Sequence, residues 1–203
     1  MQGKDLSGIH IEGHIKIYDP KTQEVFINKR NAIHYENMSV ALAESIANAG
    51  QGFIYEIAFG NGGTTVDPTG IITYLTPNST GTNATLYSET YSKVIDDRAV
   101  TNLDPIRNKI ETRHVTGTNY TDVFVTCLLD YGEPQGQDAF DNTTNNNSDF
   151  VFDELGLKSF STTGNSKLLT HVIFHPVQKS LNRLIQVDYT VRIQSLTGIS
   201  EVA

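Results

Sequence analysis

The fold class is decided by the stretch FIYEIAFGNGG, residues 53–63. Phe53, Tyr55, Ile57 and Phe59 recur with a period of two, which places their side chains on one face of a strand. The Asn-Gly-Gly that follows favours positive φ and a tight reversal of the chain. The stretch therefore predicts a half-buried strand that enters a turn, and it contains no nucleophile and no lysine that would bind a phosphate.

The same alternation recurs along most of the chain. At the N-terminus, Ile9, Ile11, Ile15 and Ile17 face one way, and a turn at 19–22 predicts a hairpin over about 8–28. We expect the last two strands to be long, antiparallel and to close the domain, and 122–131 to be central because both of its faces carry apolar residues. The further expected strands are 70–75, 86–95, 109–115, 122–131, 150–160 with a break at Gly156, 168–174 and 184–194.

One helix is predicted, over about 38–49, because Met38, Leu42 and Ile46 recur every four residues. Asn37 or Ser39 is its expected N-cap, and the glycine after residue 49 ends it. Two long polar loops are expected, over about 76–85 and 132–149. Together these features predict a single all-β domain over 1–203, an antiparallel β-sandwich or jelly-roll-like fold with one short helix.

Composition argues against two classes of partner. The net charge is -8, with only 15 lysines and arginines, so direct nucleic-acid binding, which depends on neutralising phosphates, is not expected. The longest apolar run, 123–129, is far shorter than a membrane span, and Met1–Asp5 does not resemble a secretory signal. Cys127 is the only cysteine, and its apolar neighbours predict a buried, unreactive thiol.

Two pairs of histidines suggest a metal site at first. His10 and His14 share a face of the first strand, but they stand about 13 Å apart at roughly 3.3 Å per residue. Zinc ligands converge on one ion at about 2.1 Å, which this spacing does not allow. The same geometry applies to His171 and His175. We therefore interpret all four as polar residues on the outer face of strands.

Two loops resemble binding motifs without their defining residues. Asp141–Asn145 begins like a calcium loop, but Asn146 replaces the glycine at position six and Phe152 the acid at position twelve. Gly60–Thr65 is rich in glycine but lacks a lysine and a following helix. The first is interpreted as a solvated loop, and the second as a turn.

The carboxylate pairs Asp96-Asp97 and Asp153-Glu154 are adjacent in sequence. Neighbouring side chains of a strand point to opposite faces, which is poor geometry for a shared acid and base. The sequence therefore predicts no catalytic residues, no cofactor and no metal ligands. An enzyme built on a β-sandwich, such as a hydrolase, stays as a lesser alternative that would require a convergent acid/base pair in a deep pocket.

A resemblance supplies a biological setting. The stretches that carry it cover most of 29–193 in order: KRNAIHYENM (29–38), IAFGNGGT (57–64), LYSETY (86–91), FDELGL (152–157) and LLTHVIF (168–174). They resemble virion structural proteins of tailed bacteriophages, particularly those with contractile tails. The resemblance implies a non-enzymatic, repeated subunit of the neck or collar, of the head or tail decoration, or of another part of the tail.

From this resemblance we expect other virion proteins and further copies of the chain as partners. The expected location is the virion, after assembly in the cytoplasm of the host bacterium. The alternative is a carbohydrate- or receptor-binding module of a tail fibre or baseplate, for which aromatic-lined grooves between loops would be the supporting feature. The absence of tryptophan weighs slightly against that alternative.

Overall fold

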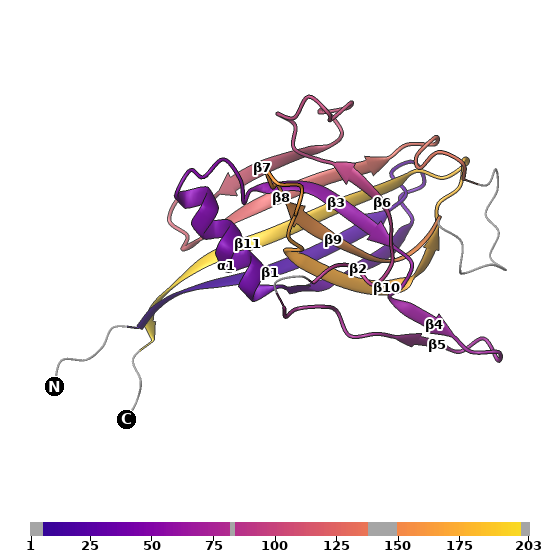
Figure 1. Ribbon diagram of the computed structural model, residues 1–203, viewed down its shortest axis with the longest axis horizontal. Helices are drawn as coiled ribbons and strands as arrows, with labels where there is room; N and C mark the ends of the chain where they lie inside the picture. Colours follow the sequence, from indigo (N-terminus) through magenta and orange to yellow (C-terminus); the bar gives the residue numbers. More distant parts are fainter. Residues whose placement is uncertain (1–5, 82–83, 138–149, 200–203) are drawn as a thin grey trace.

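The computed structural model describes residues 6–81, 84–137 and 150–199. Over these ranges the chain forms one short helix and antiparallel strands (Figure 1), which confirms the expected all-β class. Nine strands form one sheet in the order β6-β3-β9-β10-β2-β1-β11-β8-β7, and β4 and β5 form a separate hairpin. The elements are β1 (Leu6–Tyr18), β2 (Val25–Ile33), α1 (Tyr35–Ile46), β3 (Ile54–Gly60), β4 (Thr64–Val66), β5 (Ile72–Tyr74), β6 (Glu89–Val94), β7 (Lys109–His114), β8 (Tyr120–Leu129), β9 (Val151–Ser159), β10 (Thr170–Gln178) and β11 (Ile185–Ile199).

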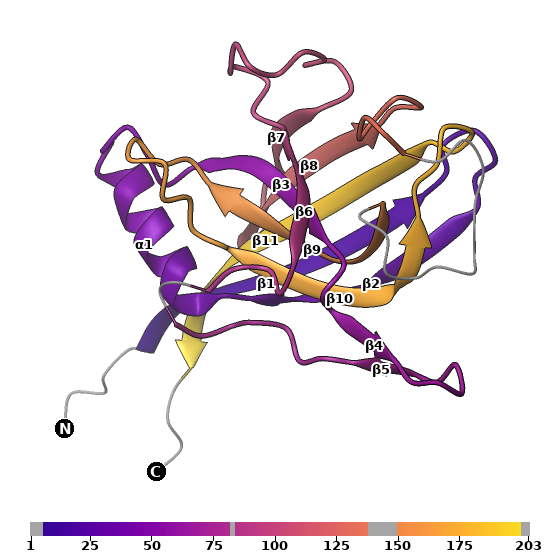
Figure 2. The same cartoon turned by 45° about the vertical axis from the view of Figure 1, so that its right-hand side comes forward.

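The large sheet curls until its two halves face each other (Figure 2), which gives the molecule a sandwich-like core. One half is β6-β3-β9-β10, and the other is β2-β1-β11-β8-β7. The halves are joined through β10 and β2, which pair only at Thr170↔Ile33 and His171↔Ala32. Ile57 and Leu155 from one half and Ile15 and Val187 from the other belong to the same buried apolar cluster.

The N-terminal hairpin is confirmed, and its first strand is also paired on its other side. β1 pairs with β2 from Gly13 onward and with β11 along nearly all of its length. Ile11, Ile15 and Ile17 are buried as expected, whereas Ile9 is exposed. Ile9 lies nearer the N-terminal end of β1 than Ile11, which is the first isoleucine of this strand in the buried apolar cluster.

The helix lies three residues earlier than predicted. It runs from Tyr35 to Ile46, and the His34 side chain caps it by accepting a hydrogen bond from the Asn37 backbone N–H at 3.2 Å. Asn37, an expected cap, is buried inside the first turn, where its side-chain amide donates to the Leu168 carbonyl. The helix therefore buries its N-terminal half, and Ile46, expected on the apolar stripe, is 83% exposed.

Three strand predictions were wrong in detail. β9 is continuous through Gly156, where a Cβ would lie 2.3 Å from the Thr170 carbonyl oxygen, so glycine is needed for close approach and does not break the strand. β10 and β11 are not neighbours, because β10 lies between β9 and β2 whereas β11 lies between β1 and β8. β8 is not central either, since only β7 lies beyond it.

The hairpin partner of β5 was also missed, because β4 is only three residues long and follows directly on a glycine-rich turn. The expected polar loops fall partly outside the described residues, at 82–83 and 138–149. No helix within the described ranges has the length and apolar character needed to cross a bilayer.

Candidate functional site

Two buried carboxylates hold the glycine-rich turn that follows β3. The backbone N–H of Gly63 donates to Asp153 Oδ1 and that of Thr64 to Asp153 Oδ2, both at 2.8 Å. The Gly62 N–H donates to Glu154 Oε1 at 3.1 Å. Three consecutive backbone N–H groups of the turn thus bind two adjacent carboxylates of β9. Both carboxylates bind the same turn although adjacent side chains of a strand point to opposite faces. The turn therefore binds two carboxylates through its backbone, and its glycines leave room for the neighbouring chain to approach this closely.

Glu154 also binds a second segment of the chain. The backbone N–H of Ser88 donates to its Oε1 at 2.7 Å, and that of Tyr87 to its Oε2 at 2.9 Å. Burial alone would favour the neutral acid, but hydrogen bonds from His171 and from these two amides outweigh it and lower the pKa of Glu154. Burial raises the pKa of Asp153, against its hydrogen bonds from Thr64 and Gly63.

His171 completes this cluster and corrects its predicted position on the outer face, because it is fully buried. Its Nε2 lies 2.9 Å from Glu154 Oε2, and its Nδ1 accepts a hydrogen bond from the Asn78 backbone N–H at 2.8 Å. An Nδ1 that accepts leaves Nε2 as the donor to the carboxylate. Both ring nitrogens are therefore engaged, and the cluster joins main-chain segments around 62–64, 78 and 87–88.

The other three histidines of the two sequence pairs, His10, His14 and His175, lie at the surface. His10 and His14 are exposed on the same face of β1, as predicted. His175 is exposed on β10, where its Nδ1 lies 3.2 Å from the Tyr74 hydroxyl. Within the described ranges, no group of three or more His, Cys, Asp or Glu side chains converges as metal ligands would. The calcium-like Asp141–Asn145 lies outside those ranges.

The remaining candidates from the sequence are Cys127 and the Asp96-Asp97 pair. Cys127 is fully buried, as predicted, and burial raises the pKa of its thiol to about 12. Asp96 is buried and forms an ion pair with Arg98 at 2.9 Å, whereas Asp97 is exposed.

Sequence reasoning missed an open groove of about 400 Å³ on the outer face of the second half-sheet. Five strands contribute to it, and three of its side chains are arginines, one each from β2, β7 and β11. They are far apart in sequence, and they line one groove because β2, β1, β11, β8 and β7 follow one another in the sheet. The lining residues are Glu12, Gly13, His14, Arg30, Arg113, Asp122, Phe124, Thr190 and Arg192.

Two of the three arginines of this groove pair with carboxylates that also line it, and Arg113 pairs at 3.2 Å with Glu111, which lies outside the lining. Arg192 binds Asp122 through two hydrogen bonds, of 2.8 and 2.9 Å, and this carboxylate raises the pKa of the guanidinium. Arg30 lies 3.4 Å from Glu12. Arg113 lies over the Phe124 ring, 4.1 Å from its centroid. Such a groove offers paired polar groups, an aromatic side chain and the exposed imidazole of His14.

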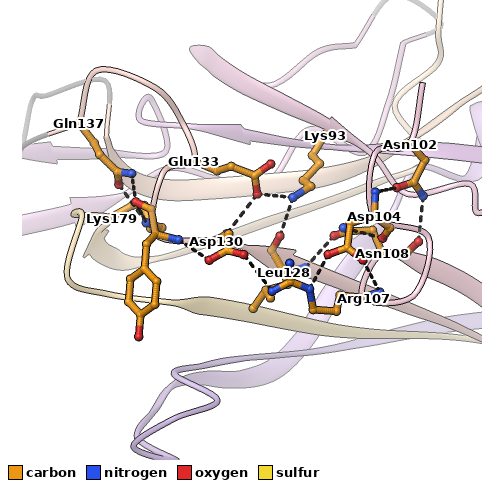
Figure 3. A network of polar contacts seen from close by, with 11 residues as sticks. Lys93, Asn102, Asp104, Arg107, Asn108, Leu128, Asp130, Glu133, Gln137 and Lys179 are labelled. Atoms are coloured by element: carbon orange, nitrogen blue, oxygen red, sulfur yellow. Dashed lines mark hydrogen bonds and ion pairs between the residues drawn. The ribbon is translucent and has the colours of Figure 1, made fainter. Parts of the chain in front are cut away.

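A second feature that the sequence did not reveal is the loop between β6 and β7, residues 96–108, which we call the display loop. Two buried asparagines hold it (Figure 3). Asn102 donates to the Asn108 carbonyl at 2.9 Å, and Asn108 donates to the Asp104 carbonyl at 3.0 Å. The Asn108 side-chain oxygen in turn accepts the backbone N–H of Leu128 at 2.9 Å. The loop is thereby fastened to the end of β8.

Ion pairs reinforce the base of the display loop. Arg107 forms ion pairs with Asp104 and, at 2.8 Å, with Asp130 (Figure 3). The Asp130 N–H donates to Glu133, which also forms an ion pair with Lys93 of β6. The backbone on both sides of the loop is thus tied into one network.

This well-held loop displays apolar side chains to the exterior. Val100 is 97% exposed, Leu103 96% and Ile106 83%. Single exposed apolar residues are ordinary on protein surfaces, but three exposed aliphatic side chains on one loop that hydrogen bonds hold in place make this loop a candidate interaction surface. No family model, curated protein or solved structure matches the chain.

Proposed function

We propose that the chain is a non-enzymatic structural subunit of a tailed-phage virion, in the neck or collar or as a head or tail decoration. The setting rests on the sequence resemblance. The observation that carries the role of an assembling subunit is the display loop, because its backbone is fixed while Val100, Leu103 and Ile106 lie almost wholly in solvent.

The physical argument is one of preorganisation. A loop whose backbone is already ordered loses little further conformational freedom on binding. Its exposed aliphatic side chains gain free energy when a neighbour removes them from water. The proposed partners are other virion proteins and further copies of the chain, and the proposed location is the virion, after assembly in the host cytoplasm.

The polar groups of the chain support the same proposal over an enzymatic one. Those most able to do chemistry, Asp153, Glu154 and His171, hold backbone amides and one another in the interior. A catalytic acid or base must reach the substrate proton, and these groups are enclosed.

Mass spectrometry of purified virions tests the proposal. We expect peptides of the chain in the particle fraction at a constant ratio to the major capsid protein through successive density-gradient steps. A host cytosolic enzyme added to the lysate serves as the control and should be lost. If the chain disappears with that control, the proposal is wrong.

The outer-face groove favours a second candidate, a carbohydrate- or receptor-binding module of a tail fibre or baseplate. Paired arginine and carboxylate groups beside Phe124 suit the hydroxyls and apolar face of a sugar ring. Binding of the isolated protein on a glycan array, lost in Arg192→Gln and retained in Arg98→Gln outside the groove, would support this candidate. A blank array would reject it.

A further inference from the structure

The side chains of the arginine-lined groove stand in two parallel rows across the outer face of the second half-sheet. In the first row, Glu12 of β1 lies opposite Arg192 of β11, Arg192 opposite Asp122 of β8, and Asp122 opposite Arg113 of β7. Neighbouring strands are about 4.8 Å apart, so the two inner charges each lie between two opposite ones. The row is a ladder of alternating charges.

The second row lies two residues further along these strands, and therefore on the same face of the sheet. Arg30 of β2 lies opposite His14, His14 opposite Thr190, and Thr190 opposite Phe124. The imidazole of His14 and the hydroxyl of Thr190 can each donate and accept a hydrogen bond. The groove thus offers groups that bind hydroxyls directly beside a row of charges.

Arg113 is the guanidinium best placed to receive an anionic group. It is already held over the Phe124 ring, 4.1 Å from its centroid, and it pairs with Glu111 at 3.2 Å. The side chain of Arg113 is 58% exposed and that of Glu111 39%, and an ion pair as exposed as this contributes little free energy. A ligand carboxylate can therefore pair with Arg113, whose planar group loses little freedom on binding because it is already ordered.

The other two arginines are less suited to this role. Arg192 donates both of its hydrogen bonds of 2.8 and 2.9 Å to Asp122, so this pair forms one fixed side of the groove. The side chain of Arg30 is 80% exposed and lies 3.4 Å from Glu12. A side chain that extends so far into water gives up more rotamer freedom when it binds a ligand.

The charges of the lining favour a ligand with a single negative charge. Three arginines and two carboxylates line the groove, a net charge of +1 with His14 neutral, on a chain whose net charge is -8. The groove is thus slightly positive although the chain is acidic, which attracts an anion. A polyanion would also meet the carboxylates of Glu12 and Asp122, which repel it. A hydroxyl group can instead donate a hydrogen bond to either carboxylate.

We propose that this groove binds an acidic sugar, that is, a saccharide that carries a carboxylate. The carboxylate pairs with Arg113 through the two parallel N–H···O bonds that a guanidinium offers, and the hydroxyls bind Thr190, His14 and Asp122. The volume of about 400 Å³ lies within the range of small-ligand sites. The inference rests on the second candidate function, because it names the class of carbohydrate that the same groove takes.

A glycan array tests the inference when it carries glycans with uronic or sialic acid beside their carboxyl-reduced counterparts, which differ only at that group. The wild type should bind an acidic glycan at least about tenfold more tightly than its reduced counterpart, because a hydrogen bond to a charged group is worth about a factor of ten or more. Isothermal titration calorimetry with the free glycans measures this ratio. Added salt should weaken binding of the acidic glycan and leave that of the reduced one nearly unchanged.

Three substitutions at exposed arginines separate a specific contact from general attraction. Arg113→Gln should abolish the preference, so that acidic and reduced glycans bind alike. Arg30→Gln removes the same charge from the other end of the groove and should keep the preference, and Arg98→Gln, outside the groove, should bind as the wild type does. Circular dichroism and thermal melting first establish that each variant is folded. A preference that survives in Arg113→Gln would overturn the inference.

Competition separates an acidic sugar from a bare carboxylate. Succinate carries carboxylates and no hydroxyls, so it should displace the bound glycan only at concentrations at least about tenfold higher than those at which the free glycan does. Equal displacement by succinate would show that the hydroxyls add nothing, and the assignment to a sugar would be wrong.

The inference and the proposed functions fail in different ways. Equal binding of acidic and reduced glycans by the wild type would refute the inference and leave the carbohydrate-binding candidate intact. A blank array would reject both. Mass spectrometry of purified virions decides the structural role whatever the array shows.

Discussion

At the scale of single residues, Gly156 shows how closely β9 and β10 approach each other. A Cβ built there lies 2.3 Å from the Thr170 carbonyl oxygen and 2.6 Å from Leu168 Cδ1. We expect Gly156→Ala to lower the free energy of unfolding by about 2–4 kcal/mol, because backbone must move. Urea denaturation measures the change. Gly132→Ala, where a Cβ meets open space, should cost about 0.5 kcal/mol or less, and an equal loss in both variants would contradict the argument.

The carboxylate of Glu154 should make the free energy of unfolding depend on pH. Glu154→Gln should lower the free energy of unfolding by about 2–3 kcal/mol at pH 7, because a charged acceptor of several hydrogen bonds is lost. The pKa of Glu154 is lowered in the folded protein. Its stabilisation is therefore complete above the unfolded pKa of about 4.3 and disappears as the pH falls through the folded value.

The difference between the wild type and Glu154→Gln should accordingly narrow in acid, below about pH 4. Urea denaturation at a series of pH values from 3 to 7 measures this difference in the free energy of unfolding, and Glu89→Gln is the control. Glu89 forms a partly exposed ion pair with Lys158, which is worth about 1 kcal/mol at most. A difference that stays constant with pH would show that the charge of Glu154 is not what stabilises the cluster.

At the scale of elements, the display loop depends on asparagines that its own sequence would not single out. Asn108→Ala removes the donor to the Asp104 carbonyl and leaves the Leu128 N–H without its acceptor. We expect a loss of about 1–3 kcal/mol and faster amide hydrogen exchange over 97–107. Asn165→Ala, at an exposed loop position, is the matched control. Unchanged exchange in the display loop of Asn108→Ala would mean that other contacts hold it.

At the scale of the whole molecule, the two halves of the sheet share one core although the strands that join them, β10 and β2, are in register at only two residue pairs. Ile57→Ala on β3 and Val187→Ala on β11 each remove a fully buried side chain from a different half. Each should lower stability by about 2–4 kcal/mol and shift the same single transition. Far-ultraviolet circular dichroism and tyrosine fluorescence check this, and separate transitions for the two halves would contradict it.

The elements were predictable where a regular pattern met a clear turn. β1 and β3 follow from alternating isoleucines and aromatics, and β11 from the same period, because a strand that covers a core on one face must alternate. The first part of β2 follows from the turn at 19–22, which predicts a returning strand. β4 was missed because three residues are too few to show a period. The helix was shifted because its cap is His34, whereas the more usual cap residue Asn37 is buried for a hydrogen bond to a distant carbonyl.

The candidate sites were predictable only as a set of separate residues. The glycine-rich turn and the Asp153-Glu154 pair could each be identified, but their meeting depends on β3 and β9 being neighbours. The arginine groove likewise depends on strand order, since Arg30, Arg113 and Arg192 come from three separate strands. No local pattern contains that information.

By itself, the sequence determined that the chain is an antiparallel β protein with one helix, because periodicity and turn chemistry act between near neighbours. The tertiary structure alone decided that the sheet curls on itself, that Glu154 and His171 are buried together, and that the β4–β5 hairpin and the display loop lie on opposite sides of the molecule (Figures 1 and 2). These features depend on which distant strands pair, and pairing is settled by the burial of the whole core and not by any single segment.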